Sequence, residues 1–177
     1  MPDKVEVPYD SLIRETLDAM TDKGILVVAQ GRAGKPNPMT IGWGLIGSIW
    51  SQPIFMVLVR PSRYTHDLLE ENGDFTVNVL PKEFSAALNH CGAVSGRDHD
   101  KFAEAKLTVE RGGLVSAPGI AEASIVYECR TVMKNEVLPS RLDPTIAKSA
   151  YRANDFHTLY YGKILAVRAD RRIAPRA

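Results

Sequence analysis

Apolar residues in this 177-residue chain occur mostly in short runs, which is the pattern of strands rather than of long helices. Two runs, residues 24–30 and 54–59, have almost no polar positions and predict buried strands. Residues 75–79 alternate apolar and polar side chains. Turn residues at 31–36 predict a hairpin from the first strand into a second strand that continues to about residue 49. Two long strands are expected at the end, 123–137 and 156–167.

Helical spacing is confined to short segments. Leu12, Ile13, Thr16, Leu17 and Met20 share one face of a helix for which Ser11 is the candidate cap. Other short helices are expected at 64–71, 82–88 and 98–104, the last with Asp98 as its N-cap, and a helical insert within 139–154.

Strands in hairpin order with only short helices between them favour an antiparallel barrel over a parallel sheet with crossover helices. The expected fold is therefore mainly β, of the α+β type, an antiparallel β-barrel with short peripheral helices. At this length, residues 1–177 are expected to form a single domain.

Gly42, Gly44 and Gly47 match the GxGxxG pattern of dinucleotide-binding folds. That pattern requires a helix to open at its last glycine, so that the helix N-terminus faces a pyrophosphate. Here residues 49–53 read as strand and turn, and Pro53 would end such a helix almost at once. We interpret these glycines instead as places where a strand bends, or where a flat ligand approaches the backbone closely.

Charge and cysteine content narrow the class of protein. The chain has 22 Lys and Arg against 21 Asp and Glu, so its net charge of +1 gives no broad field for nucleic acid, and the arginines near the end are interpreted as a solvated tail (Arg168, Arg171, Arg172 and Arg176). Cys91 and Cys129 are too few for a disulfide framework and suit a reducing compartment. No apolar run is long enough to cross a membrane, and no signal peptide is recognised, so a cytoplasmic location is expected.

Three segments carry candidate chemistry. Residues 37–44 combine an amide, a hydroxyl and a backbone nearly free of side chains beside a large aromatic, which suits the edge and face of a flat ring, although they equally suit a core. Residues 60–65 place two guanidinium groups and three hydroxyls where a strand meets a helix, either as an anion site or as a cap with solvated arginines. Residues 91–102 form a small basic loop, or simply a capped one. Residues 98–100 have the residue types of a metal site, but consecutive residues on a helix point in different directions, and no partner ligands stand at a suitable spacing. No metal site is therefore expected.

Taken together, these segments resemble the flavin reductase-like family of FMN-binding split barrels, which includes flavoredoxins, over a core of about residues 24–170. The resemblance implies that FMN is held along its ring, ribityl chain and phosphate by Asn37, Met39, Thr40, Trp43, Arg60, Ser62, Arg63, Tyr64, Thr65, Ser95, Gly96, Arg97 and Lys101. His157 lies just before a strand that contains aromatic residues and a glycine. The resemblance implies that it contacts the flavin and is the one possible catalytic residue, although a strand histidine is more often structural.

The resemblance implies an NAD(P)H:FMN oxidoreductase, with NADH or NADPH as reductant and no side chain acting as acid or base. The alternative is a flavoredoxin-type electron carrier between protein partners, with no nicotinamide site. A flavin-free module is disfavoured by Asn37, Thr65 and Lys101. The family also implies a homodimer with each flavin near the subunit boundary. Residues 138–154 are longer than a plain hairpin and are expected to cover the flavin or serve the subunit contact.

Overall fold

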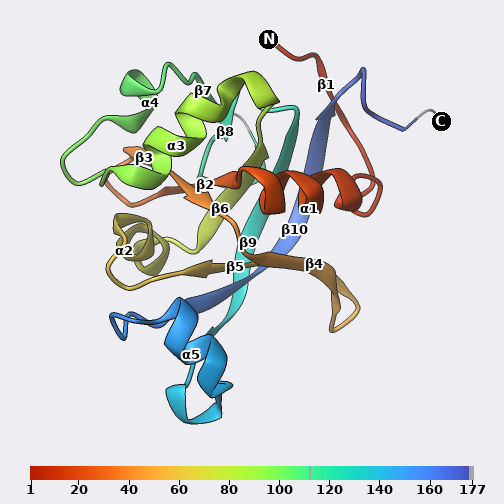
Figure 1. Cartoon of the computed structure of the whole chain (residues 1–177). Helices are drawn as coiled ribbons and strands as arrows, with labels where there is room; N and C mark the ends of the chain where they lie inside the picture. Colours follow the sequence, from red (N-terminus) through yellow and green to blue (C-terminus); the bar gives the residue numbers. More distant parts are fainter. Residues whose placement is uncertain (112, 176–177) are drawn as a thin grey trace.

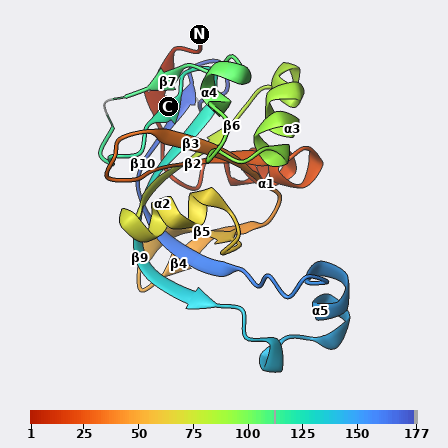
Figure 2. The same cartoon turned by 90° about the vertical axis from the view of Figure 1, so that its left-hand side faces the viewer.

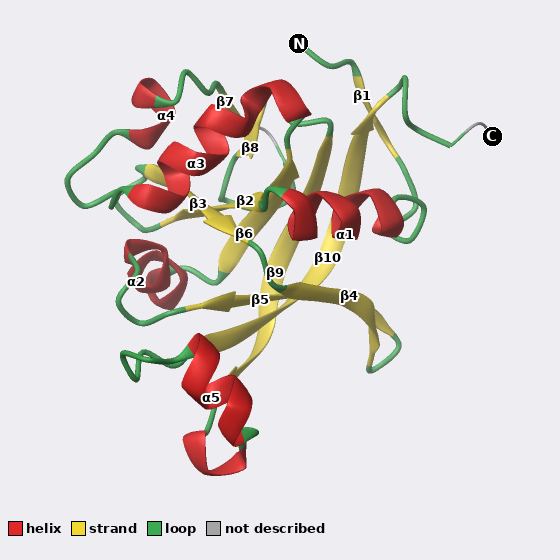
Figure 3. Cartoon of the chain, in the orientation of Figure 1, coloured by secondary structure: helices red, strands yellow, loops and turns green. Residues whose placement is uncertain are grey.

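The computed structural model describes residues 1–111 and 113–175 and consists mainly of strands, with short helices around them (Figure 1, Figure 3). The strands of the main sheet are β1 (Lys4–Glu6), β2 (Ile25–Gln30), β3 (Pro36–Ile41), β4 (Gly44–Ile49), β5 (Gln52–Val59), β6 (Asp74–Val79), β9 (Ile125–Glu136) and β10 (Thr158–Asp170), and β7 (Val109–Glu110) pairs separately with β8 (Gly119–Ile120). The helices are α1 (Ile13–Asp22), α2 (Tyr64–Glu71), α3 (Ser85–Ala93), α4 (Lys101–Glu104) and α5 (Pro144–Ala150), with 3-10 turns at Lys82–Phe84 and Pro139–Arg141.

The main sheet is antiparallel at every described pairing and runs in the order β3-β2-β6-β9-β10-β5-β4, with β1 added to β10. Its two edge strands, β3 and β4, follow each other directly in the chain but do not pair. The sheet is therefore a barrel left open between these two strands, where Gly42 and Trp43 carry the chain from one edge to the other. This confirms the expected antiparallel barrel with short peripheral helices.

Two apolar clusters pack on the two faces of β2. Ile25, Val27 and Ala29 belong to the barrel interior with the aromatic rings of Phe55 and Tyr127, which meet edge to face at 5.2 Å between centroids. Leu26 and Val28 face the second cluster, beneath α3 and α4 (Figure 1). Burial on both faces explains why β2 is a continuous apolar run rather than an alternating one.

Several local predictions were wrong. The second strand does not continue to residue 49, because β3 ends at Ile41 and β4 begins at Gly44. Ser11 does not cap α1; Leu12 occupies the N-cap position and the Ser11 hydroxyl donates to the Pro8 carbonyl at 2.6 Å. Asp98 does not cap α4. Asp100 does so instead, because its carboxylate accepts from the Ala103 amide at 3.2 Å.

Residues 138–154 do contain a helical insert, formed by α5 and the preceding 3-10 turn. Asp143 caps α5 by accepting from the Thr145 amide at 2.8 Å. Figure 2 shows the insert standing away from the barrel body, between the end of β9 and the start of β10.

Of the arginines interpreted as a solvated tail, Arg168 does not belong to one, whereas Arg171 and Arg172 are exposed as expected. Arg168 lies within β10 and pairs with Glu128 at 3.1 Å, while Arg171 pairs with Asp3 at 2.9 Å. Arg172 pairs with Asp170 at 2.5 Å, and Arg176 lies outside the described residues. Among residues 1–111 and 113–175, no helix is long and apolar enough to cross a membrane.

Candidate functional site

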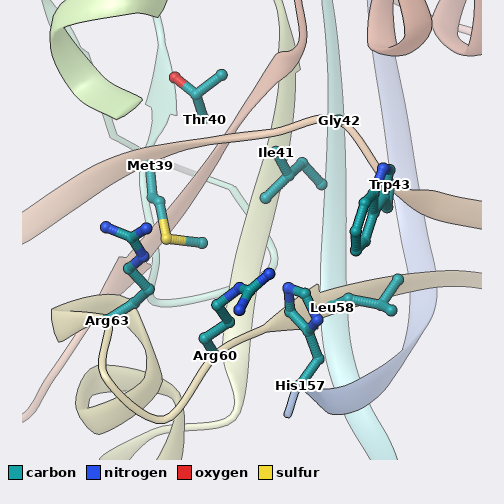
Figure 4. Close-up of a pocket in the computed structure, with 9 residues that line it drawn as sticks. All are labelled: Met39, Thr40, Ile41, Gly42, Trp43, Leu58, Arg60, Arg63 and His157. Carbon is teal, nitrogen blue, oxygen red and sulfur yellow. The ribbon is translucent and has the colours of Figure 1, made fainter. Parts of the chain in front are cut away.

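Two cavities adjoin at the open seam of the barrel. The first, of about 210 Å³, is lined by Met39, Thr40, Ile41, Gly42, Trp43, Leu58, Arg60, Arg63 and His157 (Figure 4). The second, of about 150 Å³, is lined by Asn37, Met39, Thr40, Ser62, Arg63, Tyr64, Thr65, Cys91, Gly92, Val94, Ser95, Gly96, Arg97 and Lys101. Met39, Thr40 and Arg63 belong to both, so the two cavities form one elongated site.

Every residue that the sequence proposed for the site lines one cavity or the other. The sequence missed Leu58 in the first cavity. Other lining residues lie in the candidate segments but were not assigned a ligand contact individually: Ile41, Cys91, Gly92 and Val94. From the sequence, Gly42 is interpreted as one of the places where a strand bends or a flat ligand approaches the backbone. Leu58 lies in the predicted strand 54–59, but an almost wholly apolar run gives no sign of which side chain faces a ligand cavity.

A basic end forms in the second cavity around the start of α2. No side chain caps the N-terminus of α2, and Arg63 occupies the N-cap position. The first amides of a helix have no partner within it and attract an anion. Among the described residues, the Arg63 guanidinium forms no hydrogen bond. This end of the site thus combines free backbone donors with a cation.

Lys101 supplies a second cation from the opposite wall. Its side chain is buried, and its ammonium donates to the carbonyls of Pro38 at 3.1 Å and Cys91 at 2.8 Å. Two of its three protons are thereby used, and the third remains for a ligand. Burial lowers the pKa of Lys101, and the nearby Arg63 lowers it further, which an anion placed between them would reverse.

Asn37 has an unsatisfied acceptor in the same cavity. Its amide nitrogen donates to the Thr65 hydroxyl at 2.9 Å, but its buried Oδ1 has no partner among the described residues. Gly96 lies against that oxygen, where an added Cβ would be 1.9 Å away. A buried carbonyl without a donor is uncommon in proteins and fits a site that receives a donor from a ligand.

Arg97 is not free to meet an anion by itself. Its guanidinium donates to the Ser62 carbonyl at 3.1 Å and to the Asp67 carboxylate at 2.6 Å, and it lies 5.4 Å from the centroid of the Tyr64 ring. Arg97 therefore ties the loop containing Ser95 and Gly96 to α2, and Asp67 offsets its charge.

The first cavity is lined by apolar and aromatic side chains together with polar ones, among them Arg60 and Arg63. Met39, Ile41 and Leu58 contribute aliphatic walls, and the half-exposed indole of Trp43 lies 5.4 Å from the His157 ring at a tilt of 59° (Figure 4). Burial, helped by the charge of Arg60, lowers the pKa of His157 to about 4, so its imidazole is neutral at neutral pH.

Arg60 and Ser62 are tied to the insert. The two terminal nitrogens of Arg60 donate to the carbonyls of Ala150 at 2.8 Å and Asp155 at 3.0 Å, and the Ser62 hydroxyl donates to the Asp155 carboxylate at 2.5 Å. Both residues line the site, but the Arg60 guanidinium and the Ser62 hydroxyl make these bonds and so hold the insert against the site.

The arrangement suits a flat ring system with an anionic tail. The apolar first cavity can take the ring, while the cations, helix amides and orphan carbonyl of the second cavity can take a polar chain that ends in an anion. Small-molecule sites in proteins have volumes of about 300 Å³ and above. The two cavities together lie near this lower end.

Comparison with known proteins gives a family and a fold. Residues 19–176 match the model described as a flavin reductase like domain. A protein of Archaeoglobus fulgidus, named only as uncharacterized, is 32% identical over 133 residues, which is 75% of this chain and 65% of that protein. The chain spans about half to two thirds of the length of the curated relatives it matches.

Two solved structures resemble this one. The flavoredoxin of Desulfovibrio vulgaris (Miyazaki F) has a TM-score of 0.68 and 26% identity, covering 84% of this chain and 70% of that chain. A flavin reductase-type protein with a split barrel domain from Shewanella frigidimarina has a TM-score of 0.68 and 18% identity, covering 92% and 77%. The second likeness shows the fold alone, which is the split barrel.

Proposed function

Because this chain belongs to the flavin reductase-like domain family, we propose that it binds FMN along the two adjoining cavities and acts as an NAD(P)H:flavin oxidoreductase. The observation that carries the proposal is the convergence of fourteen residues from four separate parts of the sequence on one elongated site, with aromatic and aliphatic side chains in the first cavity and the buried cation of Lys101 in the second.

The described residues fit each part of FMN. Arg63, Lys101 and the first amides of α2 would hold the phosphate. Asn37 would accept a hydrogen bond from the ligand through its unpaired Oδ1. Met39, together with the other apolar side chains of the first cavity, would lie against the ring.

Bound FMN supplies a ring that accepts hydride from a nicotinamide and passes the electrons onward. The chain's part is to bind and orient. The apolar walls of the first cavity exclude water, and the half-exposed Trp43 leaves one side of that cavity open to a second flat molecule. His157 is neutral, so it can serve as a hydrogen-bond partner without adding charge.

A homodimer is part of the proposal. Large apolar side chains are exposed along β4 and its following turn, at Leu45, Ile49 and Trp50. Adjacent exposed apolar side chains are typical of surfaces that another chain covers. Cys91 and Cys129 are unpaired and buried, which agrees with the proposed cytoplasmic location.

A second candidate is an electron carrier of the flavoredoxin type, without a nicotinamide site and with protein partners. The similarity to flavoredoxin over 84% of this chain favours it. The FMN-holding residues serve both candidates equally, so the difference lies in whether a nicotinamide can reduce the flavin.

The test is to record the visible absorption of the purified protein with and without FMN, and then to add NADH or NADPH without oxygen. Rapid bleaching of bound flavin supports the reductase, and the faster nicotinamide identifies the reductant. Flavin that stays oxidised with both supports the carrier. A protein that neither carries nor takes up FMN contradicts both candidates.

A further inference from the structure

The insert, residues 138–154, contributes one buried side chain. Every residue of this segment is described, and Tyr151 alone among them is buried, with 4% of its surface exposed. The helix α5 that precedes it buries none of its residues. Tyr151 is therefore the point at which the insert is packed into the rest of the molecule.

Tyr151 is held by the residues around it. Arg60, at the end of β5, donates to the carbonyl of Ala150 at 2.8 Å and to that of Asp155 at 3.0 Å, on either side of Tyr151 in the sequence. The guanidinium carbon lies 5.2 Å from the Tyr151 ring centroid. The ring of Phe156 stacks on that of Tyr151 at 4.7 Å with an interplanar angle of 20°. The Tyr151 ring is thus fixed before any ligand is present.

The hydroxyl of Tyr151 meets the imidazole of His157. Its oxygen lies 2.8 Å from Nδ1, and the two rings meet edge to face at 5.4 Å. Among the described residues, Nε2 of His157 has no hydrogen-bond partner, although His157 lines the first cavity. One ring nitrogen is therefore held by the protein and the other is left for a ligand.

We propose that Tyr151 is a positioning residue for His157. Its hydroxyl donates to Nδ1, which fixes the proton of the neutral imidazole on Nε2 and presents that N–H as a donor at the first cavity. Through Tyr151, the insert thereby decides that His157 presents a hydrogen-bond donor to the first cavity.

The direction of this hydrogen bond follows from the groups that face it. A neutral imidazole has one donor and one acceptor nitrogen. The charged groups around His157 are Arg60, Arg63 and Asp155. Burial and the two arginines lower the pKa of His157 more than Asp155 raises it, so the imidazole is neutral at neutral pH. Burial raises the pKa of Tyr151, so the phenol keeps its proton. A phenol is also a more acidic donor than an imidazole N–H, which favours O–H to N.

The consequence for the ligand rests on the proposed function. If FMN or an acceptor binds in the first cavity, the Nε2 proton selects a ring carrying a carbonyl or another hydrogen-bond acceptor on its edge. Without the Tyr151 hydroxyl, Nδ1 could hold the proton instead, and that edge would then face a lone pair.

The test is nitrogen-15 NMR of the four histidines, on the protein as isolated and again with FMN. His157→Gln assigns the His157 signal. In the wild type we expect a protonated Nε2 and an unprotonated Nδ1. In Tyr151→Phe we expect a mixture of both tautomers. Tyr127→Phe is the matched control, because Tyr127 is also buried and its hydroxyl lies 2.8 Å from that of Thr16, away from the site.

Protonated Nδ1 in the wild type would overturn the proposal, as would His157 signals that are identical in Tyr151→Phe and wild type. With FMN, we expect riboflavin affinity to fall about fivefold in Tyr151→Phe, the effect of one ordinary hydrogen bond, and to stay unchanged in Tyr127→Phe. A wild type with the expected tautomer that binds no flavin would contradict the proposed function and leave the role of Tyr151 standing.

Discussion

Replacing Lys101 with methionine tests the basic end of the site most directly. Methionine keeps much of the stem of Lys101, a residue that is 5% exposed, and removes the ammonium, which donates to two carbonyls. The carbonyls of Pro38 and Cys91 lose a donor, but the protein also no longer holds a buried charge. We therefore expect a modest change in melting temperature and a large change in anion binding.

The magnitude follows from one hydrogen bond between charged groups, about 1.5 to 3 kcal/mol. This corresponds to a loss of about tenfold to a hundredfold in FMN affinity. Titrations followed by flavin fluorescence, with FMN and with riboflavin in parallel, separate the phosphate from the ring. Lys101→Met should weaken FMN binding by this factor and leave riboflavin binding nearly unchanged.

His99→Ala is the control, because His99 is close in sequence but bonds Glu104 at the surface. Equal losses for FMN and riboflavin in Lys101→Met, or equal losses in both variants, would refute the placement of the phosphate beside Lys101. Because burial lowers the pKa of Lys101, the ammonium loses its proton at a lower pH than an ordinary lysine. FMN affinity should therefore fall at alkaline pH while riboflavin affinity does not.

Three further predictions concern packing and pH. Gly162→Ala should lower the free energy of unfolding by about 1 to 3 kcal/mol, because the new Cβ would lie 2.4 Å from a ring atom of Phe75, whereas Gly47→Ala meets nothing within 4 Å and should change denaturant melts little. Gly96→Ala should abolish FMN binding in the fluorescence titration, since the new Cβ would clash with Oδ1 of Asn37. The protein should stay folded, because Gly96 lies on a loop. The pKa of His157 is lowered to about 4, below the roughly 6.5 of an unfolded histidine, so the unfolded chain takes up that proton first as pH falls. Wild-type melting temperature should thus fall between about pH 6.5 and 4 more steeply than that of His157→Gln, and parallel curves would contradict the burial of a neutral imidazole.

Much of the fold could be predicted because strand signals are local. The continuous apolar run of β2 and the helical spacing of α2 gave those elements nearly to the residue. The antiparallel order followed from the short connections between strands. The sequence also singled out segments 37–44, 60–65 and 91–102, and the structure brings residues of all three segments together around two adjoining cavities. That these residues hold FMN stays a prediction.

The misses share a physical cause. Ser11 was expected to cap α1 and Asp98 to cap α4, but Leu12 and Asp100 occupy those positions. The residue at the N-cap position is decided by where the chain turns into the helix, and packing fixes that point. The family resemblance implied that Arg97 helps to hold the phosphate, and this stays a prediction; the structure adds that its guanidinium pairs with Asp67, thirty residues earlier in the chain.

By itself, then, the sequence determined which segments are strands, which residue types the site contains and that the sheet is antiparallel, because each of these depends on near neighbours. Only the tertiary structure decided that the chain crosses the open seam of the barrel at Gly42 and Trp43. It also decided that Arg60 holds the insert and that Tyr151 meets His157. Those features depend on which distant groups are brought within hydrogen-bonding distance when the barrel folds, and no local pattern encodes that distance.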